Sequence, residues 1–166
     1  LAQRSKNLTQ QRFGNTMKLF APLYISNHCY NRCTYCGFSM DLKIDRHVLS
    51  DKDIEEEAKV IATKGIKNIV ILTGEAPDVA GLEFIERAVR IVRPYMSSVG
   101  IEVQPLKETE YRQLINAGVD NISLYQETYH PDQYLIYHLS GKKRQFSKRL
   151  DAVDAAGKAG FYRINL

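Results

Sequence analysis

The chain has 166 residues, a net charge of +4, 44% hydrophobic residues and 25% charged residues. This length is enough for one domain with a hydrophobic core, and the composition is ordinary for a globular protein. No apolar run is long enough to cross a membrane, no signal peptide is recognisable, and no basic stripe indicates nucleic-acid binding. We therefore expect a cytoplasmic protein with neither membrane nor nucleic acid as partner. The first residue, Leu1, and the final strand-like segment suggest a fragment cut at both ends.

In chain order, strand-like and helix-like segments alternate after an opening stretch, 1–14, that resembles the end of a helix. Short apolar runs predict strands at 18–26, 67–73, 99–105, 120–126 and 162–166. Apolar residues at helical spacing, with capping residues and terminal glycines, predict helices at 50–65, 81–95, 107–118, 131–138 and 146–160. The alternation indicates a parallel sheet with right-handed crossovers. It is compatible with an open doubly wound sheet and with part of a (β/α)8 barrel.

The three cysteines of the chain, Cys29, Cys33 and Cys36, all lie in the loop after the first predicted strand, with the spacing C-x3-C-x2-C. A structural zinc site and a ferredoxin-type cluster both require four ligands. His28 is poorly placed as a fourth ligand, because neighbouring side chains in an extended segment point apart. Three thiolates instead suit a [4Fe–4S] cluster in which one iron stays open for a substrate or cofactor. A zinc knot or a non-catalytic iron–sulfur module is the alternative.

Polar residues follow the predicted strands at their carboxyl ends, which is where parallel βα folds bind ligands. They are Thr73, Gly74 and Glu75 after the second strand, Glu102 and Gln104 at the end of the third, and Gln126, Glu127, Thr128 and Tyr129 after the fourth. This arrangement predicts an active site at one edge of the sheet. The alternative for Glu75 is a helix cap, and the alternative for Gln104 and Gln126 is a satisfied polar group.

The cysteine loop matches the C-x3-C-x-aromatic-C signature, and the chain thereby resembles the radical S-adenosylmethionine (SAM) enzymes. Further segments resemble the aromatic amino-acid lyases of that superfamily, above all the 2-iminoacetate synthase family of thiamine thiazole biosynthesis. These segments are "FGNTMKLFAPLYISNHCYNRCTYCGFS", "LTGEAPD", "IEVQPL", "AGVDNISLYQETYH" and "HLSGKK". The resemblance implies an α/β fold that forms the N-terminal part, strands one to five, of a (β/α)8 TIM-like barrel.

The resemblance also implies two cofactors, a [4Fe–4S] cluster on the three cysteines and SAM on the open iron. The residues that it implies for SAM are Tyr35 against the adenine, Gly74 and Glu75 at the ammonium group, Glu127 at the ribose hydroxyls, and Gln104 and Gln126 in the mouth of the site. Many relatives have two glycines before this glutamate, whereas this chain has "TGE".

The activity implied by the resemblance is radical cleavage of the Cα–Cβ bond of tyrosine to 2-iminoacetate (dehydroglycine) and 4-cresol. It implies a flavodoxin- or ferredoxin-type reductant and a thiazole synthase as partners. The alternatives are the tyrosine lyase of [FeFe]-hydrogenase maturation and a biotin-synthase-like enzyme.

Two further groups of residues receive a structural interpretation. Lys142, Lys143 and Arg144 are predicted to form a solvated basic turn rather than an anion site. His130 and His138 are predicted to lie at the surface or to cap a helix, because no partner for proton transfer is evident.

Overall fold

The computed structural model describes residues 1–166 as an α/β fold built on five parallel strands. The strands are β1 (Ala21–Ser26), β3 (Asn68–Thr73), β4 (Ser98–Glu102), β5 (Asn121–Ser123) and β7 (Ile164–Asn165). They lie side by side in that order, so the order in space follows the order in the chain. A doubly wound sheet would reverse direction from its first strand, whereas a barrel adds each strand beside the last. The topology is therefore that of a barrel.

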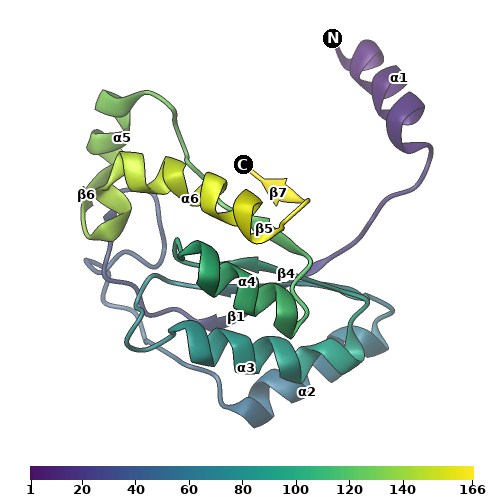
Figure 1. Cartoon of the computed structure of the whole chain (residues 1–166), viewed down its shortest axis with the longest axis horizontal. Coiled ribbons are helices and arrows are strands. Elements are labelled where there is room, and N and C mark those ends of the chain that lie inside the picture. The colour runs from purple at the N-terminus through teal and green to yellow at the C-terminus, as the bar shows by residue number, and fades with distance from the viewer.

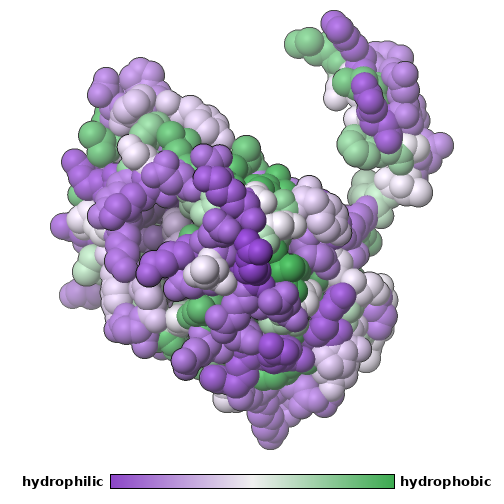
Figure 2. All heavy atoms as spheres, viewed as in Figure 1, coloured by the Kyte–Doolittle hydropathy of each residue, from purple (hydrophilic) through white to green (hydrophobic).

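Four helices cover one face of this sheet in chain order (Figure 1). They are α2 (Asp51–Thr63), α3 (Leu82–Val92), α4 (Glu108–Ala117) and α6 (Phe146–Ala159), and α3 continues into a 3-10 turn at Arg93–Tyr95. At the start of α2, Ser50 and Asp53 form a capping box in which the two residues are bonded reciprocally. The outer surface of these helices is mainly hydrophilic (Figure 2).

The hydrophobic core lies between the sheet and these helices. Alternate residues from β1 to Leu124, just after β5, point into it and are buried: Leu23, Ile25, Ile69, Ile71, Val99, Ile101, Ile122 and Leu124. Ile164 of β7 is partly buried against the same core. Period-two alternation along a strand places the residues between them on the opposite face. That face carries Tyr24, Leu72 and Glu102 and is open, with a cavity of about 650 Å³.

The opening helix α1 (Ala2–Phe13) has no buried residue and stands apart from the sheet and its helices (Figures 1 and 2). Its helical conformation agrees with the sequence prediction. None of the helices combines the length and the apolar character that a membrane span needs.

Strand lengths and one small sheet differ from the sequence prediction. The strand expected at 99–105 ends at Glu102, three residues before Pro105, which has no N–H to pair. The strands expected at 120–126 and 162–166 are shorter, as β5 and β7. A second sheet pairs β2 (Arg32–Cys33), inside the cysteine loop, with β6 (His138–Ser140), directly after α5 (Pro131–Tyr137). Strands of two and three residues are too short to show a periodicity, so the sequence could not reveal this pairing.

Candidate active site

The cysteine loop lies at the carboxyl edge of the sheet, between β1 and α2. Cys33 is buried, whereas Cys29 and Cys36 are half-buried, and none of the three forms a disulfide. All three line one cavity of about 300 Å³, together with Gly74 and Glu75 at the end of β3. Burial raises the pKa of the Cys33 thiol to about 11, against an opposing effect of Lys143. The structure thus brings the predicted cysteines and the predicted "GE" pair to one place.

Arg46 holds the two ends of the cysteine loop together. Its Nη1 donates to the carbonyl oxygens of Asn27 at 2.6 Å and Phe38 at 3.0 Å. Its Nη2 donates to the carbonyl oxygen of Ser39 at 2.8 Å. Because a planar guanidinium presents its donors in a fixed geometry, these bonds fix the loop shape. Sequence reasoning missed this residue, which lies outside the cysteine motif.

Gly74 lets the backbone of β3 approach the cysteine loop closely. A Cβ atom at this position would lie 2.2 Å from the carbonyl oxygen of His28 and 2.9 Å from the Cβ of Cys29. Real side chains do not tolerate such distances, so only glycine fits here without movement of the loop. The single glycine of "TGE" therefore has a clear steric reason.

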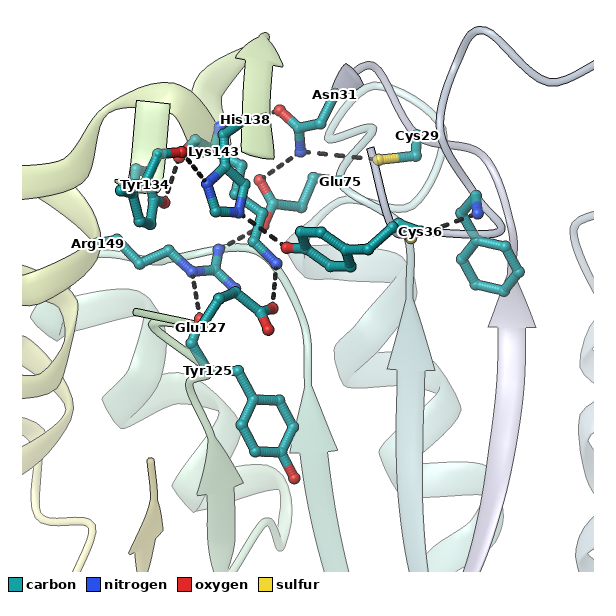
Figure 3. Close-up of polar contacts among 12 residues, drawn as sticks. Cys29, Asn31, Cys36, Glu75, Tyr125, Glu127, Tyr134, His138, Lys143 and Arg149 are labelled. Atoms are coloured by element: carbon teal, nitrogen blue, oxygen red, sulfur yellow. Dashed lines mark hydrogen bonds and ion pairs between the residues drawn. The ribbon is translucent and has the colours of Figure 1, made fainter. Parts of the chain in front are cut away.

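Glu75 forms a buried ion pair with Arg149 of α6, whose side chain is 7% exposed (Figure 3). Asn31 of the cysteine loop donates from Nδ2 to the second carboxylate oxygen of Glu75 at 2.8 Å. The Arg149 pKa is raised, because the Glu75 carboxylate outweighs the opposing effect of burial. The helix-cap alternative for Glu75 is wrong, since Gly81 is the N-cap of α3.

Asn31 also connects the cysteine loop to the segment after β6. Its Oδ1 accepts from the backbone N–H of Lys143 at 2.9 Å, and its Nδ2 lies 3.6 Å from the sulfur of Cys29. A single buried amide therefore contacts a cysteine, the Glu75 carboxylate and the basic turn (Figure 3).

Glu127 and Lys143 form a second ion pair beside the first, with Nζ and Oε1 at 2.8 Å. Burial would raise the pKa of Glu127, but the bond and charge of Lys143 outweigh it and hold the pKa below its ordinary value. Glu127 is the one non-glycine residue with a positive φ, 67°. Strain of this kind is concentrated at functional sites. The prediction of a solvated basic turn suits the exposed Lys142 but is wrong for Lys143.

Arg144, the third residue of the predicted basic turn, is exposed, but its guanidinium is used within the fold. Its Nη1 donates to the carbonyl oxygen of His138 at 2.8 Å and to that of Leu135 at 3.2 Å. The side chain thus braces the end of α5 and the start of β6.

His138 is fully buried and lies between two tyrosines. Its Nδ1 is 2.7 Å from the carbonyl oxygen of Tyr134, which can only accept, so Nδ1 carries the proton. Burial lowers the pKa of His138, and in the neutral ring Nε2 accepts from the hydroxyl of Tyr35 at 2.8 Å. The surface or capping role expected for His138 is wrong. His130 does cap α5, by accepting from the N–H of Gln133.

Tyr35 is the aromatic residue of the cysteine motif. Its pKa is raised by burial and by the charge of Glu127, so the hydroxyl stays protonated. Lys143 Nζ lies 5.6 Å from the centre of the Tyr35 ring, within the range of a cation–π contact. The contacts with His138 and Lys143 therefore fix the position of the ring, which does not itself line the cysteine cavity.

The two glutamines have different environments. Gln104 donates from Nε2 to the carbonyl oxygen of Ala80 at 3.1 Å and lines a neighbouring cavity instead of the cysteine cavity. It is a satisfied polar group, and its expected place in the mouth of the site is wrong. Gln126 is 3% exposed, and neither atom of its amide has a partner. Buried polar groups are almost always bonded, so Gln126 is a group that a ligand would satisfy.

Arg149 could have been found from the sequence. It stands on the apolar face of the helix predicted at 146–160, where the other buried residues are alanines. A charged residue at such a position requires a buried partner. Asn31 carries no comparable signal.

Comparison with known proteins gives relatives over the whole chain. The model of the Radical SAM superfamily matches residues 23–166. The 2-iminoacetate synthases of Escherichia coli (strain K12) and Salmonella typhimurium (strain LT2) are 46% and 43% identical to this chain over all of its length. The chain spans 44% of the length of each.

Among solved structures, that of HydG, a maturase of the [FeFe]-hydrogenase, superimposes with a TM-score of 0.94 at 26% identity. The match covers 98% of this chain and 37% of that one. The expected fold class, strands one to five of a TIM-like (β/α)8 barrel, is confirmed by this match and by the strand order.

Proposed function

The chain belongs to the radical SAM superfamily, whose cofactors are a [4Fe–4S] cluster and SAM, and we propose that it is part of a tyrosine lyase of this family. The reaction breaks the Cα–Cβ bond of tyrosine and yields 2-iminoacetate and 4-cresol, which together account for every atom of tyrosine. The 46% identity to a 2-iminoacetate synthase supports this assignment over the hydrogenase-maturase alternative, since two HydG structures are 26% and 32% identical to this chain.

The observation that carries the proposal is the convergence of three cysteines on one cavity beside Gly74. Three thiolates hold three irons of a cubane and leave the fourth iron without a protein ligand. Lys143 and Arg149 line the same cavity, and each is paired with a carboxylate, Glu127 and Glu75 respectively. The donor set of three cysteines therefore fits the cluster.

The chain's own residues also fit SAM. The cluster, when bound, supplies the electron for cleavage of SAM and so starts radical chemistry. Tyr35 would hold the adenine with a ring fixed by His138, and the backbone at Gly74 and Glu75 would accept from the ammonium group. Glu127 would accept from ribose hydroxyls. The unpartnered amide of Gln126 is buried beside it and suits a further polar group of the ligand.

The proposal includes the partners of the reaction. A flavodoxin- or ferredoxin-type protein would deliver the electron, and a thiazole synthase would receive the imine, which hydrolyses readily in water. The proposed setting is the cytoplasm, where clustered cysteines stay reduced and available to iron.

An electron paramagnetic resonance (EPR) experiment tests the cofactor part of the proposal. The anaerobically reconstituted enzyme should give the signal of a reduced [4Fe–4S] cluster that changes when SAM is added. The Cys33→Ala variant should lose this signal. Tightly bound zinc without any cluster signal would overturn the proposal.

A product assay tests the substrate. Addition of tyrosine, SAM and reductant should yield 4-cresol in chromatography. A SAM-responsive cluster that forms no 4-cresol would keep the family chemistry and reject tyrosine, in favour of a biotin-synthase-like or another radical SAM reaction.

A further inference from the structure

Glu102, at the carboxyl end of β4, is an acidic residue of the site without a partner in the chain. Of the other two carboxylates, Glu75 pairs with Arg149 and Glu127 pairs with Lys143. Glu102 forms neither an ion pair nor a hydrogen bond through its side chain, although it is half-buried. Burial raises its pKa, and Lys143 opposes this effect. A carboxylate in this position costs free energy unless a cation joins it.

The position of Glu102 connects two cavities. The cavity of about 300 Å³ beside the cysteines and the cavity of about 650 Å³ on the open face of the sheet have three residues in common. They are Tyr24, Leu72 and Glu102. A ligand that occupies parts of both cavities therefore contacts these three side chains.

The three residues form a row across neighbouring strands. Tyr24 of β1 pairs in register with Leu72 of β3, and Leu72 pairs with Glu102 of β4. Residues paired in a parallel sheet point to the same face. The row thus offers an aromatic and an aliphatic surface on one side and a negative charge on the other. A ligand with an aromatic ring at one end and a positively charged group at the other, such as an aromatic amino acid, would complement this row.

We propose that Glu102 binds the ammonium group of the amino-acid substrate, while the aromatic side chain of the substrate packs against Tyr24 and Leu72. This inference builds on the proposed function and identifies a substrate-binding residue outside the residues assigned to the cofactors. SAM also carries an ammonium group, but Gly74 and Glu75 at the cysteine loop are the groups placed for it. Glu102 also lines the neighbouring cavity of about 650 Å³, which none of the three cysteines reaches.

Glu102→Gln tests this role, because it keeps the size of the side chain and removes its charge. The matched control is Glu57→Gln, a change of the same kind on the exposed surface of α2. Two ligands are compared: tyrosine and desaminotyrosine, which keeps the phenol and carboxylate and lacks the ammonium group. Their equilibrium binding to the anaerobic, cluster-loaded and SAM-bound enzyme is measured by calorimetry.

We expect Glu102→Gln to weaken tyrosine binding about 10- to 100-fold, as for loss of a charged hydrogen bond. The binding of desaminotyrosine and the SAM-induced EPR change should stay as in Glu57→Gln. Equal weakening of both ligands, or no weakening of either, would overturn the inference. Weaker SAM binding with normal tyrosine binding would assign Glu102 to SAM and overturn it as well.

If the proposed function itself is wrong, the result is different. The wild-type enzyme then neither binds tyrosine nor forms 4-cresol, although the cluster and SAM are bound. A wild-type enzyme that binds and cleaves tyrosine, with an unaffected Glu102→Gln variant, would contradict the inference about Glu102 alone.

Discussion

Gly74 is the residue at which the strand and the cysteine loop come closest. Its missing side chain leaves the space that the carbonyl oxygen of His28 and the Cβ of Cys29 occupy. The position of Cys29 therefore depends on the absence of a Cβ atom at residue 74.

We expect Gly74→Ala to reduce the iron and sulfide content of the reconstituted protein several-fold, because the added methyl group displaces Cys29. The matched control is Gly157→Ala in α6, where a Cβ meets no atom within 4 Å. This control should keep full cluster content and gain about 0.5–1 kcal/mol in stability. Iron analysis and urea unfolding measure both effects. Normal cluster content in Gly74→Ala would contradict the steric argument.

Among single residues, the sequence reveals those whose type is unusual for their position in the predicted elements. Three cysteines in one loop, and polar residues directly after apolar strands, were recognisable in this way. Asn31 and Arg46 were not, since each acts through bonds to carbonyl oxygens or side chains that only the folded chain brings near. His138 was misjudged for the same reason, because its partners Tyr35 and Tyr134 surround it only after folding.

Asp120 joins the amino ends of three strands of the sheet. Its carboxylate accepts from Ser98 Oγ at 2.7 Å, from the Val99 N–H at 3.0 Å and from Arg163 at 2.6 Å. Burial would raise the pKa of Asp120, but the bonds from Asn121, Ser98 and Val99 outweigh it and lower the pKa below its ordinary value of 3.8. The ionised carboxylate thus stabilises the arrangement of β4, β5 and β7.

The sign of the pH dependence follows from this lowered pKa. The stabilisation by Asp120 is complete above the unfolded-state pKa and is lost as the pH falls through the folded-state pKa. We expect the free energy of unfolding of the wild type to decrease between about pH 5 and pH 2 more steeply than that of Asp120→Asn. Urea unfolding across this range checks it, with the exposed Asp154→Asn as control. Parallel curves for wild type and Asp120→Asn would refute the assignment.

At the scale of elements, periodicity predicted every helix of the sheet layer and every strand of the parallel sheet. The ends of β5 and β7 were missed because their outer residues leave the ladder. The chain turns away at Glu127, whose positive φ the sequence could not indicate. The pairing of β2 with β6 was missed because it depends on a contact between distant segments.

Arg149 connects parts of the molecule that are far apart in the chain. It lies on α6, its partner Glu75 follows β3, and its Nε donates to the carbonyl oxygen of Tyr125 after β5 at 3.0 Å. Through Asn31, the same network reaches the cysteine loop. The buried guanidinium of Arg149 therefore joins α6 to the segments after β3 and β5 that form the site.

We expect Arg149→Met to destabilise the folded protein by about 3–5 kcal/mol, because it leaves the buried carboxylate of Glu75 without its partner. Arg90→Met, which removes an exposed ion pair with Glu86, should cost about 0–1 kcal/mol. The comparison is made by urea unfolding of both variants. Equal effects of the two substitutions would show that the Arg149 pair contributes no more than a surface pair.

The small sheet of β2 and β6 has a consequence for the biosynthesis of the protein. Tyr35 and His138 are 103 residues apart in the chain, and Asn31 and Lys143 are 112 apart. The ribosome makes the cysteine loop first, and the segment that shapes it emerges much later. A cysteine loop on a growing chain has neither its paired strand nor its cations. We therefore expect the cysteine loop to hold iron and sulfide stably only after the segment from β6 to Arg149 has been made.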